Sequence, residues 1–300
     1  MSNQSVDGRV TEERKNYFIV STDSGEYRCT VKGTLKKQKT KVCTGDLVVV
    51  QVINSDSHEG IISDVRKRIS FLPRPPLANL SQVIFINTFK SPNMDLQAID
   101  RFLFTAMVYH VKAVIVFNKT DLLSTEDIQD LTTIEQYYAK IGYKTLHTSA
   151  SNKTGIAELV DLCKGKTSAF TGLSGVGKSS LLSLIFPQID FRTNEVSGGS
   201  GRGTHTTTHT TLHAMDQDSF IADTPGFAFV DVPTVKEEDV ACYFPEIEGI
   251  IGKCRFNNCI HDQEPGCIVN EMVQNETIAA WRYDNYMRLY KEMKTRRKNY

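Results

Sequence analysis

The 300-residue sequence lacks a long hydrophobic run, a net charge and an even number of cysteines. No apolar stretch approaches the roughly 20 residues that a membrane-spanning helix needs, so we expect no membrane partner. Basic and acidic residues number 35 each, so the overall charge does not indicate a nucleic-acid partner. The first 20 residues are polar and charged, without the apolar core of a secretory signal, and the seven cysteines are an odd number. We therefore expect a cytoplasmic protein without a disulfide framework.

The composition is that of an ordinary globular protein. Hydrophobic residues make up 40% of the chain and charged residues 23%. A chain of this length exceeds the usual size of a single domain, so we expect two or three domains.

The segment Gly172-Leu-Ser-Gly-Val-Gly-Lys-Ser179 has the spacing of a phosphate-binding loop. Residues 166–171 are predicted to form a strand and residues 179–186 a helix, which is the setting that this loop requires. Its glycines allow backbone N–H groups to crowd around phosphate oxygens at the positive end of the helix dipole. Lys178 is predicted to reach the β- and γ-phosphates, and Ser179 to bind Mg²⁺. The predicted phosphate contacts are Gly172, Leu173, Ser174, Gly175, Val176, Gly177, Lys178, Ser179 and Ser180.

A second polar segment indicates which base is bound. Asn118-Lys-Thr-Asp121 follows the apolar run 113–117, a predicted buried strand, so its side chains emerge at the ligand-binding edge of the sheet. Asp121 can accept hydrogen bonds from N1 and N2 of guanine, which adenine cannot supply. We expect Asn118 to brace the loop and Lys119 to lie along the base. The tetrapeptide alone is a weak signal because Asn-Lys-Thr-Asp also occurs in ordinary turns, but with the phosphate-binding loop it predicts guanine-nucleotide contacts at Asn118, Lys119, Thr120 and Asp121.

Two further strand ends complete the predicted site. Asp223-Thr-Pro-Gly226 follows the apolar residues 219–222, so Asp223 is placed to hold the Mg²⁺ water shell and Gly226 to donate its N–H to the γ-phosphate. Ser149 and Ala150 end the predicted strand 143–147, where a backbone N–H can bond guanine O6. Both segments also suit plain turns, and it is their shared position at strand ends that favours the site.

In this chain the guanine segment and Ser149-Ala150 precede the phosphate-binding loop, while a threonine-rich segment and Asp223-Thr-Pro-Gly226 follow it. This order resembles that of the circularly permuted GTPases and, more narrowly, the ribosome small subunit-dependent GTPase A family, over essentially the whole chain. The resemblance implies an α/β fold: a circularly permuted P-loop GTPase core with an N-terminal OB-fold β-barrel and a C-terminal helical zinc-binding domain. It also implies a protein that hydrolyses GTP to GDP, binds the small ribosomal subunit and its rRNA, acts in late assembly of the subunit and is stimulated by it. We expect a monomer.

The glutamine that usually assists GTP hydrolysis is absent from its expected position. Phe227 stands where a Ras-like enzyme has the glutamine that orients the attacking water, and an apolar side chain cannot do this. The glycine- and threonine-rich segment 198–211 resembles the family pattern Gly-Arg-Gly-x-His-Thr-Thr, which places a Mg²⁺-binding threonine at Thr206 or Thr207. We favour Thr207, and the resemblance implies that His205 positions or deprotonates the water. The alternative is that His205 is a solvated loop residue.

Cys254, Cys259, His261 and Cys267 are four potential metal ligands within fourteen residues. Three thiolates and an imidazole form the ligand set of a closed tetrahedral zinc site, which is structural because no coordination position stays open. A disulfide pair and scattered buried cysteines are the competing interpretations. The remaining cysteines are expected to be small core residues: Cys29, Cys43, Cys163 and Cys242.

The ends of the chain are predicted to form separate domains. Strands near 17–21, 26–32, 46–53 and 59–65 indicate a small barrel, and the lysine-rich segment 32–41 between them suits either RNA or solvent. We predict an OB-fold RNA-binding domain over 1–70, the GTPase domain over 71–235 with a proline-marked boundary at 73–76, and a zinc-binding helical domain over 236–300. The last helix has a basic end that suits rRNA or a frayed terminus, and an apolar stripe at Tyr286, Leu289, Tyr290 and Met293.

Alternating strands and helices from 82 to 186, with a helix capped at Ser124, indicate a mostly parallel sheet. We expect loss of the γ-phosphate to be transmitted to the C-terminal domain through residues 226–240. Two rival functions stay open: a nucleotide-gated RNA-binding scaffold with little hydrolysis, favoured by Phe227, and an ATP-dependent small-molecule kinase that shares only the phosphate-binding loop.

Overall fold

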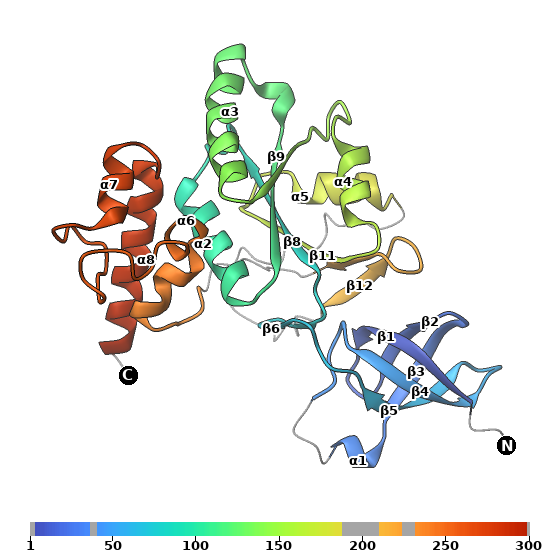
Figure 1. The fold of residues 1–300 in the computed structure, drawn as a ribbon. Coiled ribbons are helices and arrows are strands. Elements are labelled where there is room, and N and C mark those ends of the chain that lie inside the picture. Colours follow the sequence, from blue (N-terminus) through green and yellow to red (C-terminus); the bar gives the residue numbers. More distant parts are fainter. Residues whose placement is uncertain (1–3, 37–40, 188–209, 224–231, 299–300) are drawn as a thin grey trace, which may run out of the picture.

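The computed structural model describes residues 4–36, 41–187, 210–223 and 232–298, with Lys36, Asp223 and Lys298 described by their backbones alone. Figure 1 shows a barrel at the N-terminal end, a central sheet covered by helices and a helical C-terminal part on the opposite side from the barrel. This is the predicted three-part α/β architecture. No described helix is both long and apolar enough to span a membrane.

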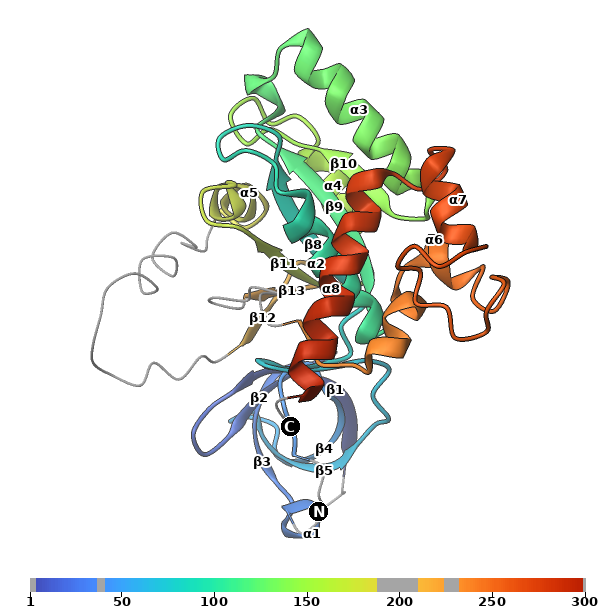
Figure 2. The ribbon, with the colours of Figure 1, turned by 90° about the vertical axis from the view of Figure 1, so that its left-hand side faces the viewer.

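The barrel contains β1 (Ser5–Glu13), β2 (Phe18–Thr22), β3 (Gly25–Val31), β4 (Leu47–Asn54) and β5 (Glu59–Val65), with α1 (Gly33–Lys36) after β3. It closes because β1 pairs with both β2 and β4, and β5 joins β3 to β4; it appears as a ring in Figure 2. Val10 of β1, Val20 of β2 and Val50 of β4 point into the barrel and are fully buried. The four predicted strands are confirmed, and the arrangement is consistent with an OB-fold. We did not predict β1, because its nine residues include only two that are apolar.

The prolines at 73–76 lie in a short hairpin that follows the barrel. Its strands are β6 (Phe71–Pro73) and β7 (Pro76–Ala78), so prolines end one strand and begin the next. Proline is tolerated at these positions because a two-stranded edge does not require every N–H.

The central sheet has the order β10-β9-β8-β11-β13-β12. Its strands are β8 (Gln82–Thr88), β9 (Lys112–Asn118), β10 (Lys144–His147), β11 (Thr167–Gly172), β12 (Thr211–Ala214) and β13 (Phe220–Asp223). Five of them are parallel and β12 alone is antiparallel to its neighbour, which confirms the predicted mostly parallel sheet. The carboxyl ends of the parallel strands therefore meet at one edge.

Helices cover both faces of this sheet (Figures 1 and 2): α2 (Leu96–Val108) and α3 (Thr125–Lys140) on one, α4 (Ile156–Cys163) and α5 (Lys178–Ile185) on the other. Along β8, Val83 and Phe85 join the core beneath α2, while Ile84 and Ile86 join the core beneath α4 and α5. Every residue of β8 is buried, as expected for a central parallel strand. Ser124 caps α3 through a capping box with Asp127, as predicted.

The C-terminal part contains η3 (Glu237–Tyr243), α6 (Pro245–Glu248), α7 (Ile268–Gln274) and α8 (Ala280–Lys298). The predicted apolar stripe of α8 is buried in one core cluster with η3 and α6. Cys29, Cys43 and Cys163 are buried as expected, but the prediction for Cys242 was wrong, because that thiol is exposed. Cys242 lies on the outer side of η3, whose inner side presents Val240 and Ala241.

A buried charge network joins α8 to the central core. Arg282 and Asp100 are 1% and 0% exposed, and the Arg282 guanidinium donates hydrogen bonds to Asp100 at 2.5 Å and to Glu246 of α6 at 2.6 Å. The Tyr138 hydroxyl and the Asn285 amide donate to the two oxygens of the same Asp100 carboxylate. Both oxygens of the Asp100 carboxylate thus accept hydrogen bonds, which is the condition under which a buried ion pair is tolerated.

We predict that Arg282→Met destabilises the protein by about 3–5 kcal/mol, because it leaves Asp100 and Glu246 buried without their cation. Urea unfolding is the measurement. The matched control is Arg288→Met, an exposed position on the same helix, which is expected to change the free energy of unfolding by less than about 0.5 kcal/mol. Equal effects of the two substitutions would contradict the role assigned to the network.

Candidate functional site

The phosphate-binding loop runs from the end of β11 to the start of α5. Gly172 lies so close to β8 that an added Cβ would stand 2.3 Å from the Ile86 carbonyl oxygen, and Gly175 and Gly177 have φ values of +82° and +91°. A residue with a side chain fits none of these positions without strain. The loop therefore needs its glycines for backbone shape, and it delivers Lys178 and Ser179 to the first turn of α5.

The guanine segment contacts this loop directly. Asn118, 2% exposed at the end of β9, donates from Nδ2 to the Val176 carbonyl at 2.8 Å. Its other side-chain atom, Oδ1, accepts a hydrogen bond from Thr148 at 3.1 Å. The Asn118 amide thus ties together the guanine segment, the phosphate-binding loop and the end of β10, which are separate in the sequence.

Lys119 strengthens the same connection. It has a left-handed backbone, with φ of +60°, and its ammonium donates to the carbonyls of Gly175 and Ser91, each at 2.7 Å. With the ammonium fixed at its far end, the Lys119 side chain connects the guanine segment to the phosphate-binding loop and to the loop after β8.

The Asp121 carboxylate is oriented by the Ser149 hydroxyl, which donates to Oδ1 at 2.5 Å. Ser149 is fully buried and its N–H donates to the Thr154 carbonyl at 3.0 Å. The next N–H, that of Ala150, has no hydrogen-bond partner among the described residues. Thr120 braces the segment through two hydrogen bonds to the Thr148 carbonyl.

Ser179 fits the predicted contact with Mg²⁺. Its hydroxyl oxygen is buried and lacks a hydrogen-bond partner within the described part of the chain. A buried hydroxyl without a partner costs free energy unless a ligand satisfies it. The position at the start of α5, directly after Lys178, is where a nucleotide-bound Mg²⁺ requires an oxygen ligand.

The two predicted catalytic residues, His205 and Thr207, lie outside the described residues. So do the predicted phosphate contact Gly226 and the neighbouring Thr206 and Phe227. Asp223 ends β13, and its backbone pairs with Thr211 of β12. The described residues consequently include the guanine segment and the phosphate-binding loop.

Our sequence analysis missed the loop after β8. The Ser91 carbonyl holds Lys119, and Lys90 forms an ion pair with Asp127 at 2.5 Å, at the capping box of α3. The same contacts, with Ser124, hold the pKa of the Asp127 carboxyl at about 2. No motif marks this loop, since a backbone carbonyl can come from any residue type.

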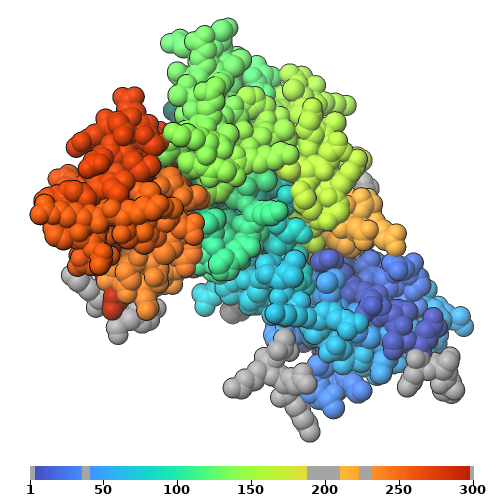
Figure 3. All heavy atoms as spheres, in the orientation of Figure 1, coloured from blue at the N-terminus to red at the C-terminus, as the bar shows by residue number. Residues whose placement is uncertain are grey.

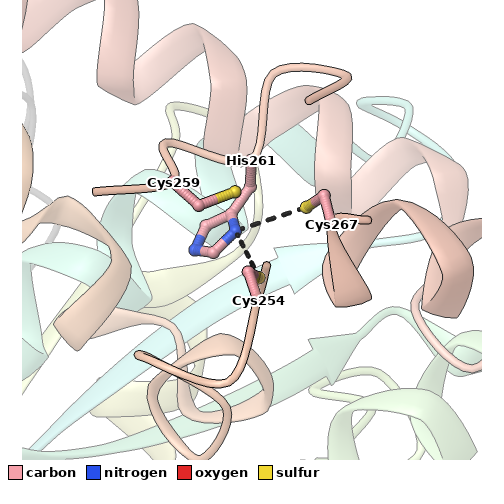
Figure 4. A group of neighbouring side chains, drawn as sticks. All are labelled: Cys254, Cys259, His261 and Cys267. Atoms are coloured by element: carbon pink, nitrogen blue, oxygen red, sulfur yellow. Dashed lines mark hydrogen bonds between the residues drawn. The ribbon is translucent and has the colours of Figure 1, made fainter. Parts of the chain in front are cut away.

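The second site is the cysteine and histidine cluster between α6 and α7, shown in Figure 4. The ligand atoms of Cys254, Cys259, His261 and Cys267 all lie within 4.8 Å of one another. The Nδ1 atom of His261 stands 3.7 Å from the Cys254 sulfur and 3.5 Å from the Cys267 sulfur. Zn–S bonds of about 2.3 Å and Zn–N bonds of about 2.0 Å at a tetrahedral angle place sulfur and nitrogen about 3.5 Å apart. The four side chains therefore fit a zinc ion with His261 bound through Nδ1.

The surroundings of the cluster suit a metal ion. Burial lowers the pKa of His261, which favours the neutral imidazole that binds metal. Burial and the adjacent thiols raise the pKa of Cys259 to about 12, and burial raises the pKa of Cys267, so a bound cation would favour the thiolate forms of these two residues. Tyr283 and Tyr286 of α8 donate to the carbonyls of His261 and Ile260, which fixes the loop against the helix.

The expected RNA-binding surface of the barrel is tested only in part. Residues 37–40 of the lysine-rich segment lie outside the described residues, and Lys41 forms an ion pair with Glu13. Arg68 donates both to Asp46, which is fully buried, and to the Lys41 carbonyl. Arg68 is therefore a structural residue, whereas Lys32 is exposed.

Comparison with known proteins identifies the family of this chain. A family model described as RsgA GTPase matches residues 65–233, and one described as RsgA N-terminal domain matches residues 7–62. The chain is 38% identical over 295 residues to the small ribosomal subunit biogenesis GTPase RsgA of Moorella thermoacetica, covering 98% of this chain and 100% of the relative. It is 36% identical to the protein of the same name from a Geobacillus species, with 98% and 100% covered.

Solved structures give the same result. The crystal structure of YjeQ from Thermotoga maritima aligns with a TM-score of 0.84 and 34% identity, covering 97% of this chain and 99% of that one. YloQ, described as a circularly permuted GTPase, aligns with a TM-score of 0.81 and 28% identity, covering 98% and 96%. The kinase alternative, which required the guanine segment to be accidental, is therefore wrong. The chain is a circularly permuted GTP hydrolase that belongs to the RsgA GTPase family.

Proposed function

We propose that this protein is a Mg²⁺-dependent GTPase that binds the small ribosomal subunit during late assembly, and that the subunit stimulates its GTP hydrolysis. GTP holds the bound state, and hydrolysis to GDP and phosphate releases it. Two curated relatives carry names that refer to small ribosomal subunit biogenesis, which supports this partner.

The hydrogen bond from Asn118 to the Val176 carbonyl is the observation on which the nucleotide site chiefly rests. It places the base-reading segment against the phosphate-binding loop, so one molecule carrying guanine and phosphates can contact both. Asp121, aimed by Ser149, reads the guanine edge, and the Ala150 N–H meets its O6.

Within this site we assign the phosphate contacts to residues 172–180 and the metal ligands to Ser179 and Thr207, with Asp223 holding the water shell. Bound Mg²⁺ neutralises charge on the β- and γ-phosphate oxygens. Lys178 and the loop N–H groups hold the phosphates in place, Gly226 donates to the γ-phosphate, and His205 orients or deprotonates the attacking water.

We further propose that one zinc ion is bound by Cys254, Cys259, His261 and Cys267 as a structural ion. It would hold the single loop between α6 and α7 in one conformation, and Tyr283 and Tyr286 would connect that loop to α8.

The division into an OB-fold RNA-binding domain (1–70), a GTPase domain (71–235) and a zinc-binding helical domain (236–300) belongs to the same proposal, as do a monomeric state and a cytoplasmic location. In this arrangement the barrel and the C-terminal part are two separate rRNA-contacting ends around one GTPase core.

We predict that Asp121→Asn weakens GTP and GDP binding at least about tenfold, because an amide presents a donor where guanine N1 and N2 also donate. Titration with a fluorescent guanine nucleotide measures this. Asp130→Asn, an exposed carboxylate on α3, is the matched control and is expected to bind as the unmodified protein does. Unchanged affinity in Asp121→Asn would remove the assigned base contact.

We predict that purified small subunits increase GTP turnover, and that His205→Ala lowers the stimulated kcat about 10²- to 10⁴-fold through loss of a positioned base. His209→Ala, in the same segment, is the control and should retain most of the stimulated rate. Absence of stimulation in the unmodified protein would favour the alternative of a nucleotide-gated RNA-binding scaffold, to which Phe227 lends support.

We predict one zinc ion per chain, lost in Cys254→Ser and retained in the control Cys242→Ser, whose thiol is exposed. The Cys259 pKa is raised to about 12 in the metal-free cluster, so zinc binding must release protons and its affinity should rise between about pH 6 and 8. Competition with a chromophoric chelator measures both. Equal zinc content in the two variants, or affinity that falls as the pH rises, would contradict the assignment.

A further inference from the structure

Two neighbouring strand pairings connect the end of β13 in the GTPase core to the barrel. Asp223 of β13 pairs with Thr211 of β12, and Thr211 pairs on its other side with Glu12 of β1. The barrel and the central sheet therefore form one continuous hydrogen-bonded sheet in which β12 is the shared strand. In Figure 3, the orange-yellow residues around 210–220 lie between the core and the blue barrel.

A side chain of the barrel holds the beginning of that strand. The Thr44 hydroxyl donates to the Thr210 carbonyl at 3.0 Å, and the two residues are 2% and 5% exposed. Thr210 precedes β12 and lies three residues after Thr207, the threonine to which we assign Mg²⁺. The Thr210 hydroxyl is buried and has no hydrogen-bond partner among the described residues. The hydrogen bond from Thr44 to the Thr210 carbonyl is therefore the contact that fixes this residue.

The loop that presents Thr44 is firmly built. Gly45 donates to the Val10 carbonyl at 2.8 Å, and an added Cβ at Gly45 would stand 2.0 Å from the Ala78 carbonyl oxygen. The neighbouring Asp46 is fully buried and accepts two hydrogen bonds from Arg68 at 2.7 and 2.8 Å. Thr44 is therefore attached to the barrel wall and also, through its own carbonyl, to Ala78 after the barrel.

Beyond the Thr44 and Gly45 loop, β12 itself has few contacts with the barrel. β1 and β12 pair at a single register position, beyond which a hollow of about 710 Å³ separates them. Across it, the Arg9 guanidinium stands 5.0 Å above the Phe220 ring, and at the far turn Gln217 donates to the exposed Asp23 at 2.9 Å. The buried hydrogen-bonded contact thus lies at the end of β12 that adjoins the threonine-rich segment.

We propose that Thr44 is a positioning residue for GTP hydrolysis: through the Thr210 carbonyl it couples the position of the barrel to the segment that carries His205 and Thr207. A displacement of the barrel on RNA then moves Thr210 and the start of β12, whereas an unbound barrel leaves them in place. The inference rests on the proposed function and adds a route from the barrel to the catalytic residues. It is distinct from the route through residues 226–240 to the C-terminal domain.

The test compares Thr44→Val, which removes the hydroxyl at nearly constant volume, with Thr44→Ser, which keeps it. Subunit-stimulated kcat and KM for GTP are measured together with affinity for purified small subunits. Thr44→Val is expected to lose at least about fivefold of the stimulation, in kcat, while subunit affinity stays within about threefold. Thr44→Ser and the control Gln217→Ala, which removes the contact at the far turn, are expected to keep the stimulation.

A second measurement does not need the subunit. Hydrogen exchange of residues 43–46 and 211–214 is compared between GDP and a non-hydrolysable GTP analogue. The unmodified protein and Thr44→Ser are expected to show a nucleotide-dependent difference in residues 43–46, and Thr44→Val is expected to lose it while residues 211–214 keep theirs.

Three results would overturn the inference: full stimulation in Thr44→Val, an equal loss in Gln217→Ala, or the same nucleotide-dependent exchange in residues 43–46 with and without the hydroxyl. If subunits fail to stimulate the unmodified protein, the proposed function is wrong, and the exchange result alone then decides whether Thr44 couples barrel and core.

Discussion

The parallel register of β9, β8 and β11 is the constraint on which the rest of the structure depends. Thr88 pairs with Asn118 and Ile86 with Gly172, so the strands end at one edge although their motifs lie far apart in the sequence. The Asn118 amide can then bridge to the Val176 carbonyl. Because strand ends meeting in space build the site, the order in which the chain visits them can be permuted without loss of the base and phosphate contacts.

Permutation changes what is attached to that edge. The strand after the threonine-rich segment, β12, joins the barrel through β1, and the strand after it leads toward the C-terminal part. Both RNA-contacting ends that we propose would thus be connected to segments that we expect to respond to the nucleotide. The two connections differ physically, since the barrel meets the core over one strand pair and a few contacts, whereas Arg282 and Asp100 bury a charge network between α8 and α2. We therefore expect the barrel to move relative to the core more readily than the C-terminal part does.

The zinc cluster belongs to the more rigid side. His261 and Ile260 are held by tyrosines of α8, and the same helix carries Arg282 into the central core. A metal that orders the loop would therefore stabilise the interface with the core as well as its own loop. Together with the apolar core cluster that α8 shares with η3 and α6, the proposed ion would hold this region in one position against the GTPase domain.

The sequence by itself determined the base and phosphate motifs, the four clustered metal ligands, the parallel sheet and most of the barrel, because glycine spacing, soft ligands and alternating apolar residues are local signals. It missed β1, which has few apolar residues, and it misplaced Cys242, since burial depends on which side of a turn packs inward. Only the tertiary structure decided three hydrogen bonds: from Lys119 to the Ser91 carbonyl, from Arg68 to the Asp46 carboxylate, and from Thr44 to the Thr210 carbonyl. The Ser91 and Thr210 contacts use backbone carbonyls, and all three depend on distance in space, which no residue type encodes.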